Sequence, residues 1–219
     1  MNEKTFPVVL RDVMKDMIEN PTFRDLLKKI DYWFKCSCES IYQSILIYYL
    51  ERRYGEGKVK AEVEGGKKKR IDVGLYNSKN QLTDVVEIRT GKLRDVCKIK
   101  TTKNDFDKLY KGSIRKLIDT KRRRNNNIRC YLLKITHGLK GDTNRKIKCG
   151  EMKNLRELPY EEKVKFVGEM LEEELNKKIS EELGGDYKIR LVDQSSASEG
   201  ERNEIFMYHL FEVIERQAV

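Results

Sequence analysis

The sequence predicts an α/β domain in which helices flank a mixed β-sheet. The spacing of apolar residues is helical over residues 7–19, alternates over 59–63 and 71–75, and is helical again over 104–120. A further apolar stretch at residues 128–136 predicts a strand after that helix. A helical region, a three-strand meander, a helix and a strand, in this order, are typical of a mixed sheet with helices on its faces.

The helices before the meander are predicted from their apolar faces and their end signals. Residues 7–19 form the first helix, and Asn20-Pro21 fits a cap and first proline of a second, which runs to about residue 34. A third helix is expected over residues 38–54, because Gly55 follows it and glycine favours the backbone that ends a helix.

The meander needs two turns, and the sequence offers both. Gly65-Gly66 predicts the first turn, and residues 77–81 predict the second. The third strand, at residues 82–90, is apolar enough to lie inside a sheet.

The C-terminal third is less regular in its pattern. Residues 160–183 predict a long helix, residues 187–192 a strand, and residues 138–150 an exposed loop. Residues 204–215 are apolar at both the helical and the strand period, so both structures stay open there.

The length of 219 residues predicts a single domain, residues 1–219. We expect a core at about residues 37–138, an N-terminal helical extension at 1–36, and a C-terminal elaboration at 139–219 that adds further helices. Charged residues make up 37% of the chain, above the ~25% of ordinary domains, so a large solvated surface must surround this core.

The charge balance predicts a polyanionic partner. Lys and Arg number 46 and Asp and Glu 36, which gives a net charge of +10. Nucleic acid is the usual partner of such a surface, and an anionic membrane is the rival. No stretch approaches the ~20 apolar residues of a spanning helix, and the first seven residues do not form a signal peptide. We therefore expect an intracellular, cytoplasmic protein without a membrane partner.

The cysteines do not predict a zinc site. They number five and include no Cys-x-x-Cys, so free thiols are expected, with an iron–sulfur cluster or a disulfide as alternatives.

Three acidic residues occupy positions that suit metal chemistry. Asp72 interrupts the second strand, Glu87 lies in the third, and Glu39 lies in the first turn of the third helix. Because strand side chains alternate, Glu87 and Arg89 share one face, and Asp72 shares it if the two strands pair. Two nearby carboxylates can hold Mg²⁺, which prefers oxygen ligands and assists phosphodiester hydrolysis. By itself, each acid is also typical of an exposed carboxylate paired with Lys or Arg.

These parts resemble the PD-(D/E)XK nuclease superfamily over residues 37–138. The matching positions are Glu39 on a helix, Asp72 on a hairpin strand, and Glu87-Ile88-Arg89 on the next strand. The layout is most similar to the archaeal Holliday-junction-resolvase branch, and small nucleases of archaeal viruses share it. The resemblance implies a restriction-endonuclease-like fold and, for a viral member, the host-cell cytoplasm.

The resemblance also implies an activity and a set of ligands. The expected activity is Mg²⁺-dependent or Mn²⁺-dependent cleavage of DNA, on branched or otherwise structured substrates. Asp72, Glu87 and the backbone carbonyl of Ile88 would bind the metal, and Glu39 would complete or support that shell. The motif departs from the family at Arg89, which replaces a lysine and cannot exchange a proton. Lys92 is the candidate to take the lysine's place.

Basic residues bracket these acids and predict a rim that binds phosphate. Any one such run is also typical of a solvated surface. The candidate nucleic-acid-binding residues are Lys67, Lys68, Lys69, Arg70, Lys98, Lys100, Lys121, Arg122, Arg123, Arg124 and Arg129.

Three functions remain open from sequence. The first is a DNA endonuclease, catalysed by Glu39, Asp72, Glu87 and either Arg89 or Lys92. The second is a nucleic-acid-binding protein whose catalytic site is eroded, and the third is an interaction protein that uses charge for solubility. No phosphate-loop motif occurs, so no nucleotide cofactor is expected. Cutting two strands requires two sites, so a homodimer is expected.

Overall fold

The computed structural model describes residues 6–22, 39–66, 69–92, 109–124, 127–139, 159–199 and 204–216. The elements in chain order are α1 (Phe6–Glu19), α3 (Glu39–Tyr54), β1 (Val59–Gly66), β2 (Lys69–Tyr76), β3 (Leu82–Lys92), the π-helix η1 (Tyr110–Ile114), α6 (Arg115–Arg123), β4 (Arg129–Leu139), α7 (Tyr160–Leu183), β5 (Tyr187–Glu199) and β6 (Glu204–Glu215).

The strands form one six-stranded mixed sheet in the order β1-β2-β3-β4-β6-β5. The pairs β1–β2 and β2–β3 are antiparallel, whereas β3 and β4 are parallel and are connected through the helical segment that contains η1 and α6. β6 pairs antiparallel with both β4 and β5. The predicted α/β class, the meander and the mixed sheet flanked by helices are therefore confirmed.

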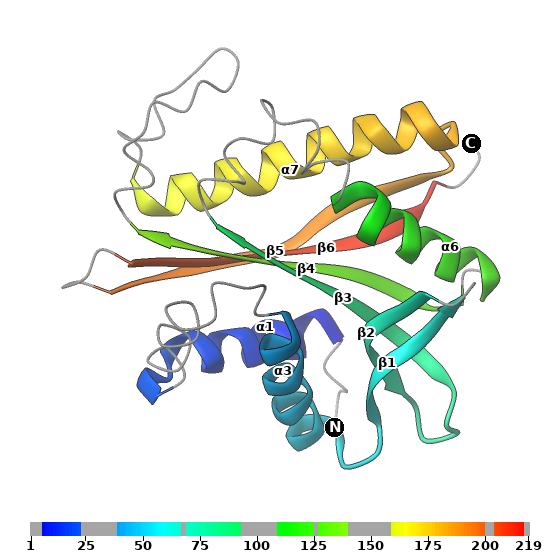
Figure 1. The fold of residues 1–219 in the computed structure, drawn as a ribbon, viewed down its shortest axis with the longest axis horizontal. Coiled ribbons are helices and arrows are strands. Elements are labelled where there is room, and N and C mark those ends of the chain that lie inside the picture. The colour runs from blue at the N-terminus through cyan, green and yellow to red at the C-terminus, as the bar shows by residue number, and fades with distance from the viewer. Residues whose placement is uncertain are drawn as a thin grey trace.

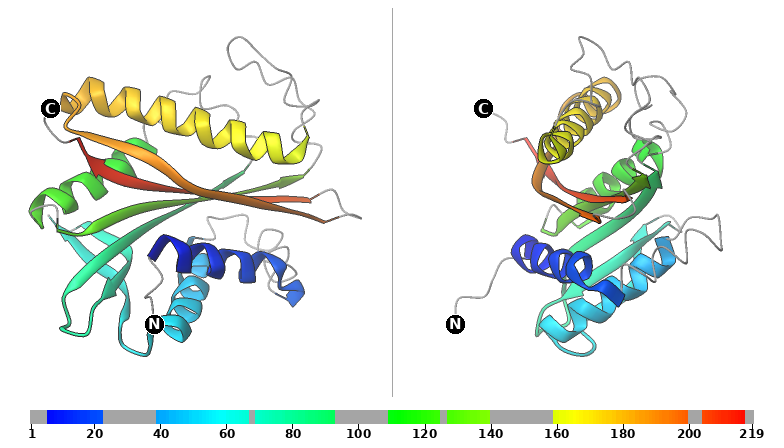
Figure 2. Two further views of the ribbon diagram at one scale, coloured as in Figure 1. Left: turned by 180° about the vertical axis from the view of Figure 1, so that it is seen from behind. Right: turned by 90° about the vertical axis from the view of Figure 1, so that its left-hand side faces the viewer.

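The helices cover the two faces of the sheet in separate layers (Figures 1 and 2). α6 and α7 pack on one face, over a core that includes Val85, Leu132 and Phe211. α1 and α3 pack on the other face, over a core that includes Val86, Leu133 and Leu210. Neighbouring residues of one strand thus enter different cores, as the alternation of strand side chains requires.

The C-terminal segment extends the sheet more than its sequence indicated. Residues 204–215 form strand β6, which lies between β4 and β5, and both faces of a strand in this position are covered. Burial on both faces explains why its apolar pattern fitted two periods. β5 also runs on to Glu199, beyond the predicted strand at 187–192. The predicted strand at 187–192 therefore belongs to a hairpin, because residues 204–215, left open between helix and strand, pair with it.

Three smaller differences concern local structure. Gly65 and Gly66, predicted as a turn, belong to β1, and Gly138, predicted in a loop, belongs to β4. The helix predicted over 104–120 begins in the described residues as a π-helix before α6. The predicted helix up to residue 34 lies outside the described residues, apart from its first two positions.

The described helices include none that is both long and apolar enough to span a membrane.

Candidate active site

The site forms where β2 separates from β3. Their ladder ends at the pair Val73↔Val86, which leaves the next backbone groups without strand partners across this gap. The Asp72 carboxylate accepts a hydrogen bond from the Ile88 amide at 2.6 Å, and Gln43 of α3 donates to the Asp72 carbonyl at 2.6 Å. Side chains therefore satisfy the backbone at the point where the sheet opens.

Glu87 is the most deeply buried acid at this opening. Its side chain is 1% exposed, and its two carboxylate oxygens contact different cations. Lys116 Nζ on α6 lies 2.5 Å from Oε2, and Arg89 Nη2 lies 3.0 Å from Oε1. A buried carboxylate with two cationic neighbours satisfies the requirement that interior charges be paired.

Arg89 connects three elements of the site. Its guanidinium donates to Glu39 on α3 at 2.9 Å, to Ser113 on η1 at 2.5 Å, and to the Gly112 carbonyl at 3.3 Å, in addition to Glu87. The side chains of Arg89 and Glu39 are each 29% exposed, so solvent reaches this side of the cluster. Arg89 thus holds the carboxylates of Glu39 and Glu87 in place with its fixed array of donors.

Burial and mutual repulsion shift the acids toward their protonated forms. Burial, and then the charge of Asp72, raises the pKa of Glu87 to about 7, although Lys116 and Arg89 act in the opposite direction. Burial also raises the pKa of Asp72, and its hydrogen bond from Ile88 opposes that shift. The two carboxylates are therefore close enough to repel each other, and Glu87 titrates near neutral pH.

The structure brings Glu39, Asp72, Glu87 and Arg89 together as one group beside Lys116. We call these five residues the charged cluster. Oxygen donors at such a group suit Mg²⁺ or Mn²⁺. Among the described residues, no three His, Cys, Asp or Glu side chains lie together as a ready metal-binding group. A metal would therefore rely on the Asp72 and Glu87 carboxylates. Metal binding by the Ile88 carbonyl stays a prediction.

Sequence reasoning missed Lys116 and Gln43. Lys116 stands beside the apolar Leu117 and Ile118, and we assigned no role to it because lysines usually face solvent. A signal was present, because Ser113, Lys116 and Thr120 repeat at helical spacing on the buried side of η1 and α6. Lys92 belongs to β3, but its side chain lies outside the described residues.

Two predicted phosphate contacts are occupied within the fold. Lys121 is buried and donates to the Ile128 carbonyl at 2.8 Å. Arg129 lies 2.7 Å from the buried Asp84, so its guanidinium neutralises an interior acid. We therefore leave both residues out of the interface proposed below.

The rest of the basic segment lies at the surface. Arg122 lies 3.6 Å from Asp186 and stacks over the Tyr187 ring, whereas Arg123 and Arg124 are exposed at the end of α6. Arg70 is exposed on β2. The candidates Lys67, Lys68, Lys98 and Lys100 lie outside the described residues, as does the side chain of Lys69.

Cys130 is the one cysteine within the described residues, and it is a buried free thiol whose pKa burial raises to about 12. It is therefore unreactive at neutral pH.

No protein-family model, curated protein or solved structure matches this chain.

Proposed function

We propose that the protein is a metal-dependent endonuclease that hydrolyses DNA phosphodiester bonds. One observation carries this proposal: two acids from neighbouring strands, Asp72 and Glu87, lie at an opening of the sheet beside a third acid and two cations. Folding to bury repelling carboxylates is unfavourable, so their convergence is better explained by catalysis than by stability.

The donor set fits a hard divalent cation. Glu87 and Asp72 both have raised pKa values, and a dication between them would relieve the repulsion that contributes to the shift at Glu87. When bound, Mg²⁺ or Mn²⁺ would neutralise phosphate charge and make a ligated water more acidic. Asp72 and Glu87 would hold it, with Glu39 in support.

Lys116 and Arg89 divide the work that one lysine performs in the family motif. Arg89 positions Glu39 and Glu87 through hydrogen bonds from a permanently charged guanidinium. Lys116 reaches the same carboxylate from α6, and an ammonium can both hold a phosphate and exchange a proton. In this proposal Lys116, rather than Lys92, takes the place of the family lysine.

A second candidate function follows from the ion pairs themselves. Both oxygens of Glu87 already contact cations, so a metal must displace at least one of them. If that displacement is too costly, the protein binds nucleic acid without cutting it. Metal binding separates the two candidates.

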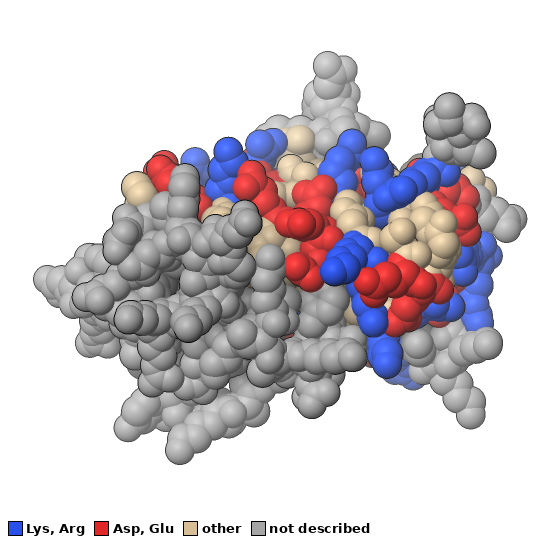
Figure 3. Space-filling view, turned by 90° about the horizontal axis from the view of Figure 1, so that it is seen from above, with Lys and Arg blue, Asp and Glu red and all other residues tan. Residues whose placement is uncertain are grey.

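The proposed DNA surface excludes the outer face of α7. Figure 3 shows Lys and Arg interspersed with Asp and Glu over this helix, as expected from its Glu-rich sequence. Such a mixed surface gives little net attraction for phosphates. A homodimer stays a prediction that the mass of the protein in solution tests.

The decisive experiment incubates the full chain with supercoiled plasmid and with a four-way junction in Mg²⁺, Mn²⁺ or EDTA. We expect cleavage with either metal and none in EDTA, and Asp72→Asn should remove it. Asp119→Asn is the matched control, because Asp119 is a half-exposed acid of α6 outside the charged cluster. Cleavage that survives in EDTA, or in Asp72→Asn, would refute the proposal.

A further inference from the structure

A second polar surface lies at the opposite end of α6 from the charged cluster. The β2–β3 turn, the start of β3, the end of α6 and the residues before β4 enclose a hollow of about 620 Å³. Its lining consists of Tyr76, Asn77, Asn80, Gln81, Leu82, Thr83, Arg124, Asn127 and Ile128. Amides, a hydroxyl and a guanidinium dominate this lining, and it contains no acidic side chain.

One wall of the hollow is a preorganised turn. The Asn77 side-chain oxygen accepts hydrogen bonds from the Lys79 and Gln81 amides at 2.9 and 3.0 Å, and its side-chain nitrogen donates to Gln81 at 3.1 Å. Asn80 has a φ of 55°, the left-handed backbone that asparagine tolerates. The turn is therefore fixed by its own side chains before any ligand arrives.

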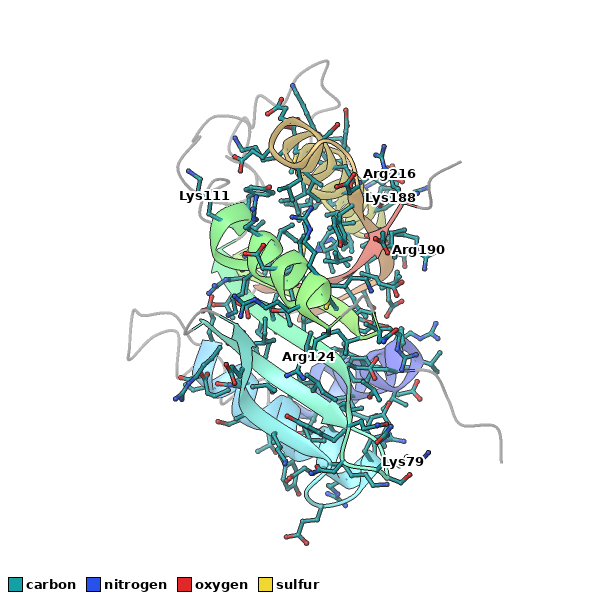
Figure 4. The ribbon with its side chains drawn as sticks, turned by 90° about the vertical axis from the view of Figure 1, so that its right-hand side faces the viewer. Lys79, Lys111, Arg124, Lys188, Arg190 and Arg216 are labelled. Atoms are coloured by element: carbon teal, nitrogen blue, oxygen red, sulfur yellow. The ribbon has the colours of Figure 1, made fainter. Side chains whose placement is uncertain are left out.

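Side chains on both walls keep hydrogen-bonding capacity for a ligand. Within the described part of the chain, the side chains of Asn80, Arg124 and Asn127 make no hydrogen bond or ion pair, and all three residues are exposed. Figure 4 shows Arg124 at the end of α6 and Lys79 on the turn, on the same side of the molecule. Unused amides beside an unpaired guanidinium match the edges of a base and a phosphate.

The position of the hollow fits a strand that also reaches the charged cluster. Lys116 and Arg124 are separated by about 12 Å along α6, at 1.5 Å per residue. That span equals about three to four phosphate steps of a DNA strand at 3.4 Å each. A bound strand could therefore contact both ends of α6 at once.

We infer that this hollow binds one nucleotide unit of the nucleic-acid strand whose phosphate lies at the charged cluster, an inference that rests on the proposed function. Arg124 contacts the phosphate, and the amides of Asn80 and Asn127 contact the base edge. The contact positions the strand and adds a base preference to the contacts made at the charged cluster.

The test is a fluorescence-anisotropy titration of the full chain with labelled single-stranded and duplex oligonucleotides in EDTA. Arg124→Ala should weaken binding by about tenfold and lower the salt slope by about one. Lys177→Ala, which changes an exposed lysine of α7 outside the proposed DNA surface, should change binding by less than about twofold, and Arg124→Lys should recover part of the affinity. Asn80→Ala with Asn127→Ala should change the affinity ratio between oligonucleotides of different base composition by about tenfold.

The remaining outcomes of the titration also decide whether the inference holds. Equal effects of Lys177→Ala and Arg124→Ala would overturn the inference, even if the wild type cleaves DNA. The inference also fails if the wild type binds none of the oligonucleotides, or if adenosine monophosphate binds the hollow while strands bind independently of Arg124. Arg124-dependent binding by a protein that never cleaves would support the hollow and refute the nuclease, so the two failures are distinguishable.

Discussion

The same face of the sheet buries two polar clusters, and they differ in kind. The charged cluster lies under η1 and α6, with the cationic side chains of Arg89 and Lys116 around Glu87. The second, the α7 cluster, consists of Gln194 and His209, which lie against Gly168. The strand residues of both clusters point to the same face of the sheet. The contrast between the clusters therefore reflects which residues occupy these positions and not where the positions lie in the fold.

The α7 cluster buries polar side chains of a different kind. His209 is fully buried, its Nε2 lies 2.9 Å from the Val164 carbonyl, and burial lowers its pKa to about 4, so it is neutral at pH 7. Gly168 has no side chain because a Cβ there would approach Gln194 Oε1 at 2.3 Å. A neutral, tightly packed cluster avoids the cost of interior charge, whereas the charged cluster accepts it, which indicates function.

The largest effect is expected from substitutions that remove a carboxylate from the charged cluster. Asp72→Asn or Glu87→Gln should reduce cleavage by ~1,000-fold or more, because each removes a metal-binding carboxylate worth ~4 kcal/mol to the transition state. DNA binding should be retained or improved, since a charge that repels phosphate is lost. Single-turnover cleavage and anisotropy measure the two properties, and robust cleavage by Asp72→Asn would mean that other residues form the site.

The next largest effect distinguishes the roles in cleavage of the cationic side chains around Glu87. Lys116→Ala should lower the cleavage rate by about 100-fold, as expected for a lost proton donor or acceptor. Arg89→Lys keeps a positive charge beside Glu87 and should preserve or raise cleavage, whereas Lys92→Ala should have a mild effect. Single-turnover rates across pH test this order. A damaging Lys92→Ala with a mild Lys116→Ala would transfer the role to Lys92.

A smaller effect is expected in the α7 cluster. Gly168→Ala should lower the free energy of unfolding by about 1–3 kcal/mol, because the added methyl group overpacks the contact with Gln194 and His209. Denaturant unfolding measures this loss, and Glu169→Ala on the exposed side of α7 is the control. Metal binding should not change in Gly168→Ala. A change there would mean that the two clusters are coupled.

The smallest effect is a pH dependence to which the two clusters contribute with opposite signs. The pKa of His209 is lowered to about 4, so its contribution to stability grows as pH rises from about 4 to 6.5. The pKa of Glu87 is raised from 4.5 to about 7. At Glu87 the native state therefore binds more protons than the unfolded state in this window, so the contribution of this group to metal-free stability falls as pH rises through it. Metal should restore stability mainly above about pH 7, because it binds the carboxylate. Thermal unfolding with and without Mn²⁺ tests this, and Glu87→Gln should flatten the dependence.

Sequence patterns predicted what depends on local periodicity. Strand alternation placed Asp72, Glu87 and Arg89 on one face, and Gly184 ends α7 with a φ of 70° after a helix predicted over the observed residues. What was missed depends on tertiary contacts. β6 is ambiguous until a neighbour covers each face, and Lys116 resembles a solvated lysine until α6 packs over Glu87. No local pattern reports that β2 pairs with β3 only from Val73 onward.

Titration calorimetry of Mn²⁺ into the full chain at about pH 8, above the raised pKa of Glu87, tests the central claim most directly. The account predicts binding that is lost in Asp72→Asn and in Glu87→Gln but retained in Asp119→Asn. Binding that survives in both cluster variants, or a wild type that binds neither Mn²⁺ nor Mg²⁺, would contradict a metal-dependent site at the charged cluster.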